Sequence, residues 1–143
     1  MSIGRRRFAV SSLVLGLAFA LGGCSAAGTT AVDTAGLPGV WTGSGGGRVD
    51  FHADGRFSMK GIPAESIGFA FGEPPDEDRV AGSGTWEQDT DEDRLNLMID
   101  AGGSFTDAKQ MAVLMVAEDG PPQVLFFSTN VDKPYGYEIR KNS

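Results

Sequence analysis

Short runs of alternating apolar and polar residues constrain the fold of this chain more than any other feature. Alternation with a period of two is typical of strands that bury one face, and the Gly, Asp and Pro residues between the runs are typical of turns. Asp54-Gly55, between two such runs, is a strong hairpin signal. A single short segment, Thr106–Met111, is a helical candidate. The runs are Val40–Ser44, Arg48–His52, Arg56–Lys60, Ile67–Phe71, Val80–Gln88, Arg94–Ile99, Met111–Ala117, Val124–Thr129 and Tyr135–Arg140.

This pattern predicts an all-β fold, a small antiparallel up-and-down barrel of about eight strands, formed by residues 37–143. The chain has 143 residues, of which 41% are hydrophobic, so it can build one small core. Closing the sheet into a barrel leaves no exposed strand edge. We expect Val49 and Phe51 to face inward on one strand of the first hairpin, and Phe57 and Met59 on the other.

The first 23 residues have the features of a signal peptide. A patch of arginines is followed by an apolar run of about 13 residues, Ala9 to Leu21, and then by small residues. A stable transmembrane helix needs about 20 apolar residues, so we do not expect a permanent span. Residues 24–36 are mostly small, with few bulky side chains and no periodicity, and we interpret them as a flexible tether.

The end of this leader, Leu21-Gly22-Gly23-Cys24, resembles the lipobox of bacterial lipoproteins. The resemblance implies cleavage between Gly23 and Cys24 and a diacylglyceryl thioether on Cys24. Acyl chains would hold the protein on the extracytoplasmic face of the cell membrane. An ordinary secretory signal with a chance cysteine is the alternative.

The arginines of the leader resemble a second known signal. Arg5, Arg6 and Phe8 match the twin-arginine export motif, which consists of two arginines, any residue and a phenylalanine. This resemblance implies that the domain folds before export. The alternative is a general secretory leader that is rich in arginine.

Two broader resemblances concern the folded part. Gly39-Val40-Trp41 at the first strand resembles lipocalin-type, or calycin-like, barrels. This resemblance implies that Trp41 closes one end of the barrel and that Arg140, from the last strand, packs on the indole. The whole layout, from the leader to a second Gly-x-Trp and the terminal Tyr137–Arg140 strand, resembles small lipoproteins of actinobacterial type, from high-GC Gram-positive bacteria. That resemblance implies no particular activity.

Composition argues against several kinds of chemistry. One Cys and one His exclude a disulfide framework within the chain and any multi-His or cysteine-rich metal centre. We expect no enzyme and no cofactor, since His52 belongs to an exposed strand end and the chain has no Gly-x-Ser-x-Gly motif. A net charge of −7 makes nucleic acid an unfavourable partner. Asp89–Asp93 partly imitates a calcium loop, but Arg94 replaces the required Gly, so we expect a solvated turn without metal.

A binding or structural role at the cell envelope remains as the preferred hypothesis, with an envelope protein or a small apolar molecule as the expected partner. One alternative is an inhibitor or modulator of a secreted or envelope enzyme that acts through the acidic loop Glu73–Arg79. Another is a carrier of a small apolar ligand, with a cavity lined by Phe69, Phe71 and Met115.

Overall fold

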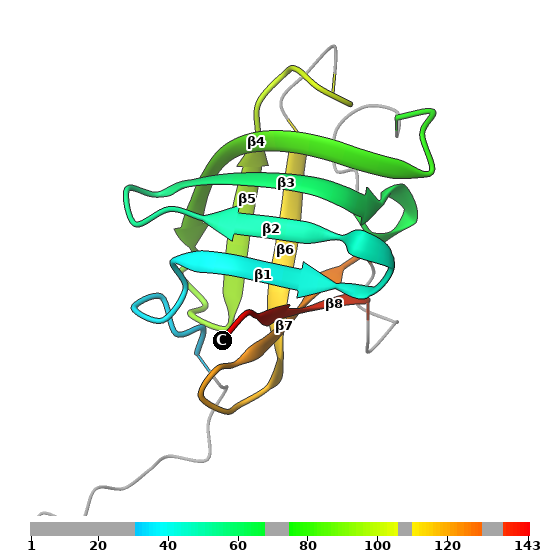
Figure 1. The fold of residues 1–143 in the computed structure, drawn as a ribbon. Helices are drawn as coiled ribbons and strands as arrows, with labels where there is room; N and C mark the ends of the chain where they lie inside the picture. Colours follow the sequence, from blue (N-terminus) through cyan, green and yellow to red (C-terminus); the bar gives the residue numbers. More distant parts are fainter. Residues whose placement is uncertain (1–30, 68–74, 106–109, 130–135) are drawn as a thin grey trace, which may run out of the picture.

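The structure is a computed structural model that describes residues 31–67, 75–105, 110–129 and 136–143. Eight strands form a closed barrel in which each strand pairs with the next and the last pairs with the first, all antiparallel (Figure 1). The predicted up-and-down barrel is therefore confirmed. The strands are β1 (Gly39–Gly43), β2 (Arg48–Phe51), β3 (Arg56–Pro63), β4 (Arg79–Gln88), β5 (Arg94–Ile99), β6 (Gln110–Glu118), β7 (Val124–Ser128) and β8 (Tyr137–Lys141).

Two predicted elements differ from the structure. Most of the expected run Ile67–Phe71 lies outside the described residues, and its first residue follows a short 3-10 turn, η2 (Ala64–Ser66), rather than opening a strand. The helical candidate 106–111 falls partly outside the described residues, and its last two residues belong to β6. None of the helices among the described residues has the length and apolar character needed to cross a membrane.

The first hairpin forms as the Asp-Gly signal predicts. Phe51 pairs with Phe57, the His52 amide donates a hydrogen bond to the Arg56 carbonyl at 2.8 Å, and Gly55 adopts a φ of 86°. A positive φ favours glycine because it carries no Cβ atom. The expected inward residues are confirmed, since Val49 and Phe51 are 0% and 1% exposed and their partners on β3 are also buried.

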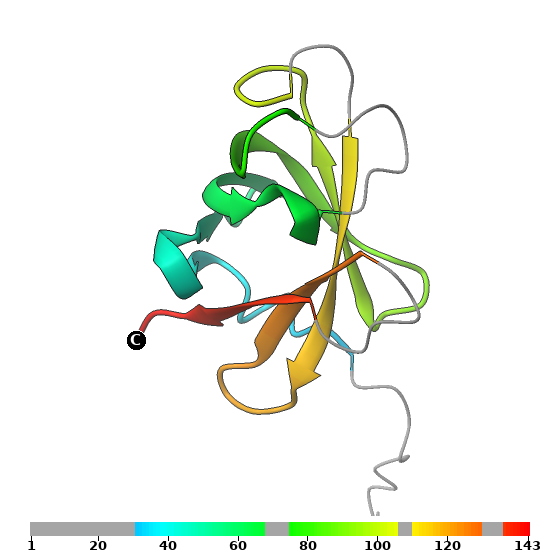
Figure 2. The ribbon, with the colours of Figure 1, turned by 90° about the vertical axis from the view of Figure 1, so that its right-hand side faces the viewer.

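One apolar cluster fills the inside of the barrel. Every strand contributes at least one residue to this cluster, because alternate residues of each strand point inward. Figure 2 shows β5, β6 and β7 side by side in one wall around this interior. The largest fully buried side chains are Phe51, Phe57, Phe127, Leu37, Ile62, Leu95, Leu97, Ile99, Leu114, Leu125, Ile139 and Val49.

The antiparallel topology gives the barrel two distinct ends. The end at which residues 31–38 lead into β1 also carries the turns 52–55, 89–93 and 119–123 and the C-terminus (Figure 1). We call it the N-terminal end. The opposite end, which we call the far end, carries the 3-10 turns η1 (Ser44–Gly46) and η2 and residues 100–105.

Candidate functional site

The predicted anchor and export residues lie outside the described residues. They are Arg5, Arg6, Phe8, Gly23 and Cys24. Phe69 and Phe71, two of the residues expected to line a ligand cavity, also lie outside them. The lipid anchor, the cleavage site and the export route therefore stay predictions.

The last part of the expected tether is attached to the barrel. The Gln123 side chain bridges two of its residues: the Asp33 amide donates to Gln123 Oε1 at 2.7 Å, and Gln123 Nε2 donates to the Ala31 carbonyl at 2.9 Å. Gln123 is only 9% exposed. We call residues 31–37 the N-terminal clasp.

Val32 is the apolar centre of the clasp. It is 4% exposed and belongs to the core cluster. Its amide donates to the Glu92 carbonyl at 2.8 Å, and its carbonyl accepts a hydrogen bond from Gln88 Nε2 at 3.2 Å. The domain therefore begins at least six residues earlier than the predicted boundary at Leu37, because the clasp buries an apolar side chain and satisfies its backbone on the barrel.

Trp41 lies under the clasp at the N-terminal end. Its indole is 2% exposed, and Nε1 donates a buried hydrogen bond to the Leu37 carbonyl at 2.8 Å. The ring also meets Phe51 edge to face, with the centroids 6.2 Å apart. Aromatic pairs favour this geometry because the positive edge of one ring meets the negative face of the other. The hydrogen bond and the ring contact together couple the clasp to the core.

Arg140 does not take the place that the lipocalin resemblance implies. β1 and β8 are neighbours as expected, but Arg140 pairs with Thr42, so these two side chains share the outer face. Trp41 is the next residue in β1 and points inward. The expected stack of Arg140 on the indole is therefore wrong. Instead, the Arg140 guanidinium meets Glu118 and Glu138 at 3.3 and 3.4 Å on the surface.

Met115 also faces away from the interior. Its neighbour Leu114 is fully buried in the core, whereas Met115 is half-buried on the outer face, where it pairs with Arg94 and Phe126. It cannot line a cavity inside the barrel. The expectation that it does is therefore wrong, because the strand register gives the inward positions of β6 to its alternate residues.

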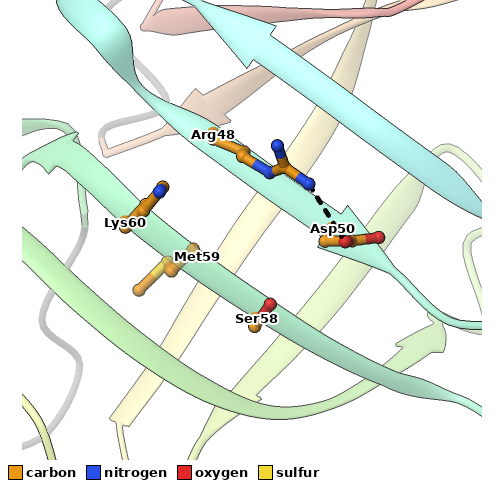
Figure 3. A pocket seen from close by; sticks show the side chains of 5 residues that line it. All are labelled: Arg48, Asp50, Ser58, Met59 and Lys60. Carbon is orange, nitrogen blue, oxygen red and sulfur yellow. Dashed lines mark hydrogen bonds and ion pairs between the residues drawn. The ribbon is translucent and has the colours of Figure 1, made fainter.

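An open depression of about 430 Å³ lies on the outside of β2 and β3, and Figure 3 shows its lining. Arg48 is paired with Lys60 across the two strands, and Asp50 with Ser58. The Arg48 guanidinium lies 3.5 Å from the Asp50 carboxylate. Met59 completes the lining. We call this the β2–β3 depression.

Two cations face each other in the β2–β3 depression although the chain is acidic. Like charges directly opposite each other on a sheet destabilise it, so their pairing favours an anion between them. Asp50 offsets part of the Arg48 charge, and Lys60 has no ion-pair partner among the residues that the structure describes. Ser58 adds a hydroxyl that can donate a hydrogen bond. The arrangement can therefore hold a carboxylate or phosphate group.

No sequence motif for catalysis or binding marks these residues, although the hairpin contains a signal for them. Along the sequence, Arg48 lies six residues before Asp54 of the Asp-Gly turn, and Lys60 lies six residues after it. A tight hairpin therefore places them opposite each other, on the face away from Phe51 and Phe57.

A second depression, of about 480 Å³, lies at the far end and includes part of the predicted acidic loop. Of Glu73–Arg79, the structure describes residues 75–79. Glu77 accepts a hydrogen bond from the Ser104 hydroxyl at 2.8 Å, and the Asp78 carbonyl accepts one from the Ala64 amide at 3.0 Å. The described part of the loop is therefore exposed but attached. The lining is Pro63, Ala64, Glu65, Glu77, Asp78 and Arg79.

His52 and Asp89, which were considered for catalysis and metal binding, lie in turns and take part in hydrogen bonds there. The exposed His52 belongs to the hairpin turn, and its carbonyl accepts the indole N–H of Trp86 at 3.0 Å. The Asp89 carboxylate accepts hydrogen bonds from the hydroxyl and amide of Thr90, which lower the pKa of Asp89. No group of three His, Cys, Asp or Glu side chains within the described ranges is placed to hold a metal ion.

Comparison with known proteins adds no relative. No protein-family model, no curated protein and no solved structure matches this chain. The interpretation of the barrel therefore depends on its own geometry.

Proposed function

We propose that this chain is a lipid-anchored binding protein on the extracytoplasmic face of the cell membrane. The observation that carries the proposal is the N-terminal clasp, which joins the predicted anchor to one defined end of the barrel. Seven peptide units separate Cys24 from Ala31, and an extended chain of that length spans about 25 Å. The N-terminal end of the barrel then lies close to the membrane and the far end points away from it.

The charge of the N-terminal end supports an anchor made of lipid alone. The turn 89–93 carries four carboxylates, and Asp54, Glu118 and Asp119 lie at the same end. Anionic headgroups repel such a surface. Acyl chains contribute about 0.8 kcal/mol for each buried CH₂ group, so two or three of them hold the domain without help from its charges.

The β2–β3 depression supports the binding role. It lies on the side of the barrel, where a lipid anchor at the N-terminal end leaves it accessible. Its paired cations and hydroxyl favour an anionic group, either a carboxylate or a phosphate, on a partner in the envelope.

A second candidate function is modulation of a secreted or envelope enzyme through the acidic loop. The far-end depression favours it, because Glu65, Glu77 and Asp78 adjoin the apolar side chains of Pro63 and Ala64 on the end that faces away from the membrane. The described residues give the carrier alternative no comparable support, since Met115 lies on the outer face.

The anchor is tested by expressing the full chain in a bacterial host with labelled palmitate. We expect the wild-type protein to incorporate the labelled palmitate and to be recovered in the membrane fraction. The Cys24→Ser variant should do neither. Wild-type protein that carries no palmitate label and is recovered in the soluble fraction would contradict the proposal.

The binding role is tested separately by titrating the chain with inorganic phosphate and with acetate while amide resonances are followed by NMR. We expect saturable shifts at Ser58 and Lys60 that are lost in an Arg48→Ala/Lys60→Ala double variant and kept in Arg56→Ala. Arg56 is the matched control because it lies on the same outer face of β3 outside the depression. Equal, non-saturating shifts in all three proteins would refute anion binding there.

A further inference from the structure

Methionine side chains occupy two different environments in the barrel. Met59 points inward from β3, is 4% exposed and belongs to the core cluster. Met98 on β5, and Met111 and Met115 on β6, are half-buried on the outer face, because their neighbours along each strand point into the core. We call these three residues the outer methionines.

Strand pairing places two of the outer methionines side by side. Met98 lies directly opposite Met111, so their Cβ atoms are about 5 Å apart. Met115 lies four residues further along β6, which corresponds to about 13 Å. The three thioethers therefore form one group on the outer surface of β5 and β6, which adjoin in one wall of the barrel (Figure 2).

The packing of the barrel does not require methionine at these positions. The core is filled by the inward residues, and other outward positions of β5 hold the polar residues Arg94 and Asn96. A thioether differs from an aliphatic side chain of similar size chiefly in its chemistry, because its sulfur can be oxidised. The chemistry of the sulfur is therefore the property that distinguishes this part of the surface.

We propose that the outer methionines are a site of reversible oxidation by peroxides. A lone pair of the sulfur attacks one oxygen of hydrogen peroxide, so that an S–O bond forms and the O–O bond breaks. The sulfur loses two electrons and becomes a sulfoxide. The peroxide is reduced, and its second oxygen leaves as water after it takes up the proton of the transferred oxygen. Methionine sulfoxide reductases return the sulfoxide to the thioether.

The outward position of these side chains lets the barrel keep its fold when they are oxidised. The sulfoxide oxygen is polar, and water can solvate it on the outer face. The same change at Met59 would bury a polar group without a partner and disrupt the core. Oxidation therefore makes the outer surface of β5 and β6 more polar and leaves the interior unchanged. The reaction requires access to the sulfurs and does not depend on the lipid anchor.

The test treats the purified full chain with hydrogen peroxide and follows each site by mass spectrometry of tryptic peptides. Trypsin places Met59, Met98 and the segment with Met111 and Met115 on separate peptides. We expect each outer methionine to take up one oxygen about tenfold faster than Met59, and the reductases to remove it. Thermal unfolding of chains oxidised only at the outer methionines should match that of untreated chains.

Leucine variants are the matched controls, because leucine and methionine have similar volumes. The triple variant Met98→Leu/Met111→Leu/Met115→Leu should unfold like the wild type and lose the fast uptake of oxygen, whereas Met59→Leu should keep it. Oxidation of Met59 as fast as that of the outer methionines, or loss of cooperative unfolding when only the outer methionines are oxidised, would overturn the proposal. The acylation of Cys24 is measured separately by the palmitate experiment, so the two proposals can fail independently.

Discussion

The two tryptophans offer a matched test of how the barrel closes at its N-terminal end. Each indole donates a hydrogen bond to a backbone carbonyl and meets Phe51 edge to face, at centroid distances of 6.2 and 6.5 Å. The two hydrogen bonds differ in their exposure to solvent. The bond from Trp41 to Leu37 is buried, whereas the bond from Trp86 to His52 is exposed.

Replacing Trp41 by Phe removes the donor and leaves the buried Leu37 carbonyl unpaired. An unpaired buried polar group costs about 1–3 kcal/mol, and the smaller ring adds a cavity, so we expect a loss of about 3 kcal/mol in the free energy of unfolding. In Trp86→Phe, water replaces the donor at the exposed His52 carbonyl, and the expected loss is about 1 kcal/mol.

Thermal unfolding followed by circular dichroism measures the difference. For a domain of this size, 1 kcal/mol corresponds to about 4 °C in Tm, so we expect decreases of about 12 °C for Trp41→Phe and about 4 °C for Trp86→Phe. Equal decreases, or a larger one for Trp86→Phe, would refute the claim that Trp41 secures the clasp to the core.

Two further predictions concern close backbone contacts and the acidic turn. A Cβ atom at Gly84 would clash with the Met98 carbonyl oxygen. Gly84→Ala should therefore prevent β4 from pairing with β5 and abolish cooperative unfolding. Gly120→Ala is the control, because a Cβ atom there would have its nearest contact at 3.9 Å, and this variant should unfold like the wild type. Thr90→Ala should raise the pKa of Asp89 toward its ordinary value in an NMR titration, because the Thr90 hydroxyl is the largest cause of its lowering. Since the folded pKa is lowered, this contact stabilises the fold above the unfolded pKa and is lost as the pH falls through the folded pKa; an unchanged titration would contradict the assignment.

The barrel could be predicted because its strands alternate and its turns carry Gly, Asp and Pro. The first hairpin is the clearest case, since the Asp-Gly turn determines both its register and its inward residues. The direction of Met115 could not be predicted in the same way. β6 is apolar at nearly every position, so its sequence has no period that separates the two faces. Pairing with Leu95 and Phe127 makes Leu114 the inward residue.

The clasp and the position of Arg140 depend on contacts between residues far apart in the chain. Val32 lies among small residues with no apolar periodicity, and its segment is held by Gln123, about ninety positions away. No local pattern indicates such a contact. Arg140 was expected near Trp41 because the end strands adjoin, but adjacency does not specify the face, which depends on a register that pairs Arg140 with Thr42.

The lipid anchor is the central claim, and the mass of the N-terminal peptide of the native protein tests it most directly. We predict that the processed chain begins at Cys24 and that its sulfur carries a diacylglyceryl group. A peptide that still contains the leader, or one that begins near Cys24 with a free thiol, would contradict the account.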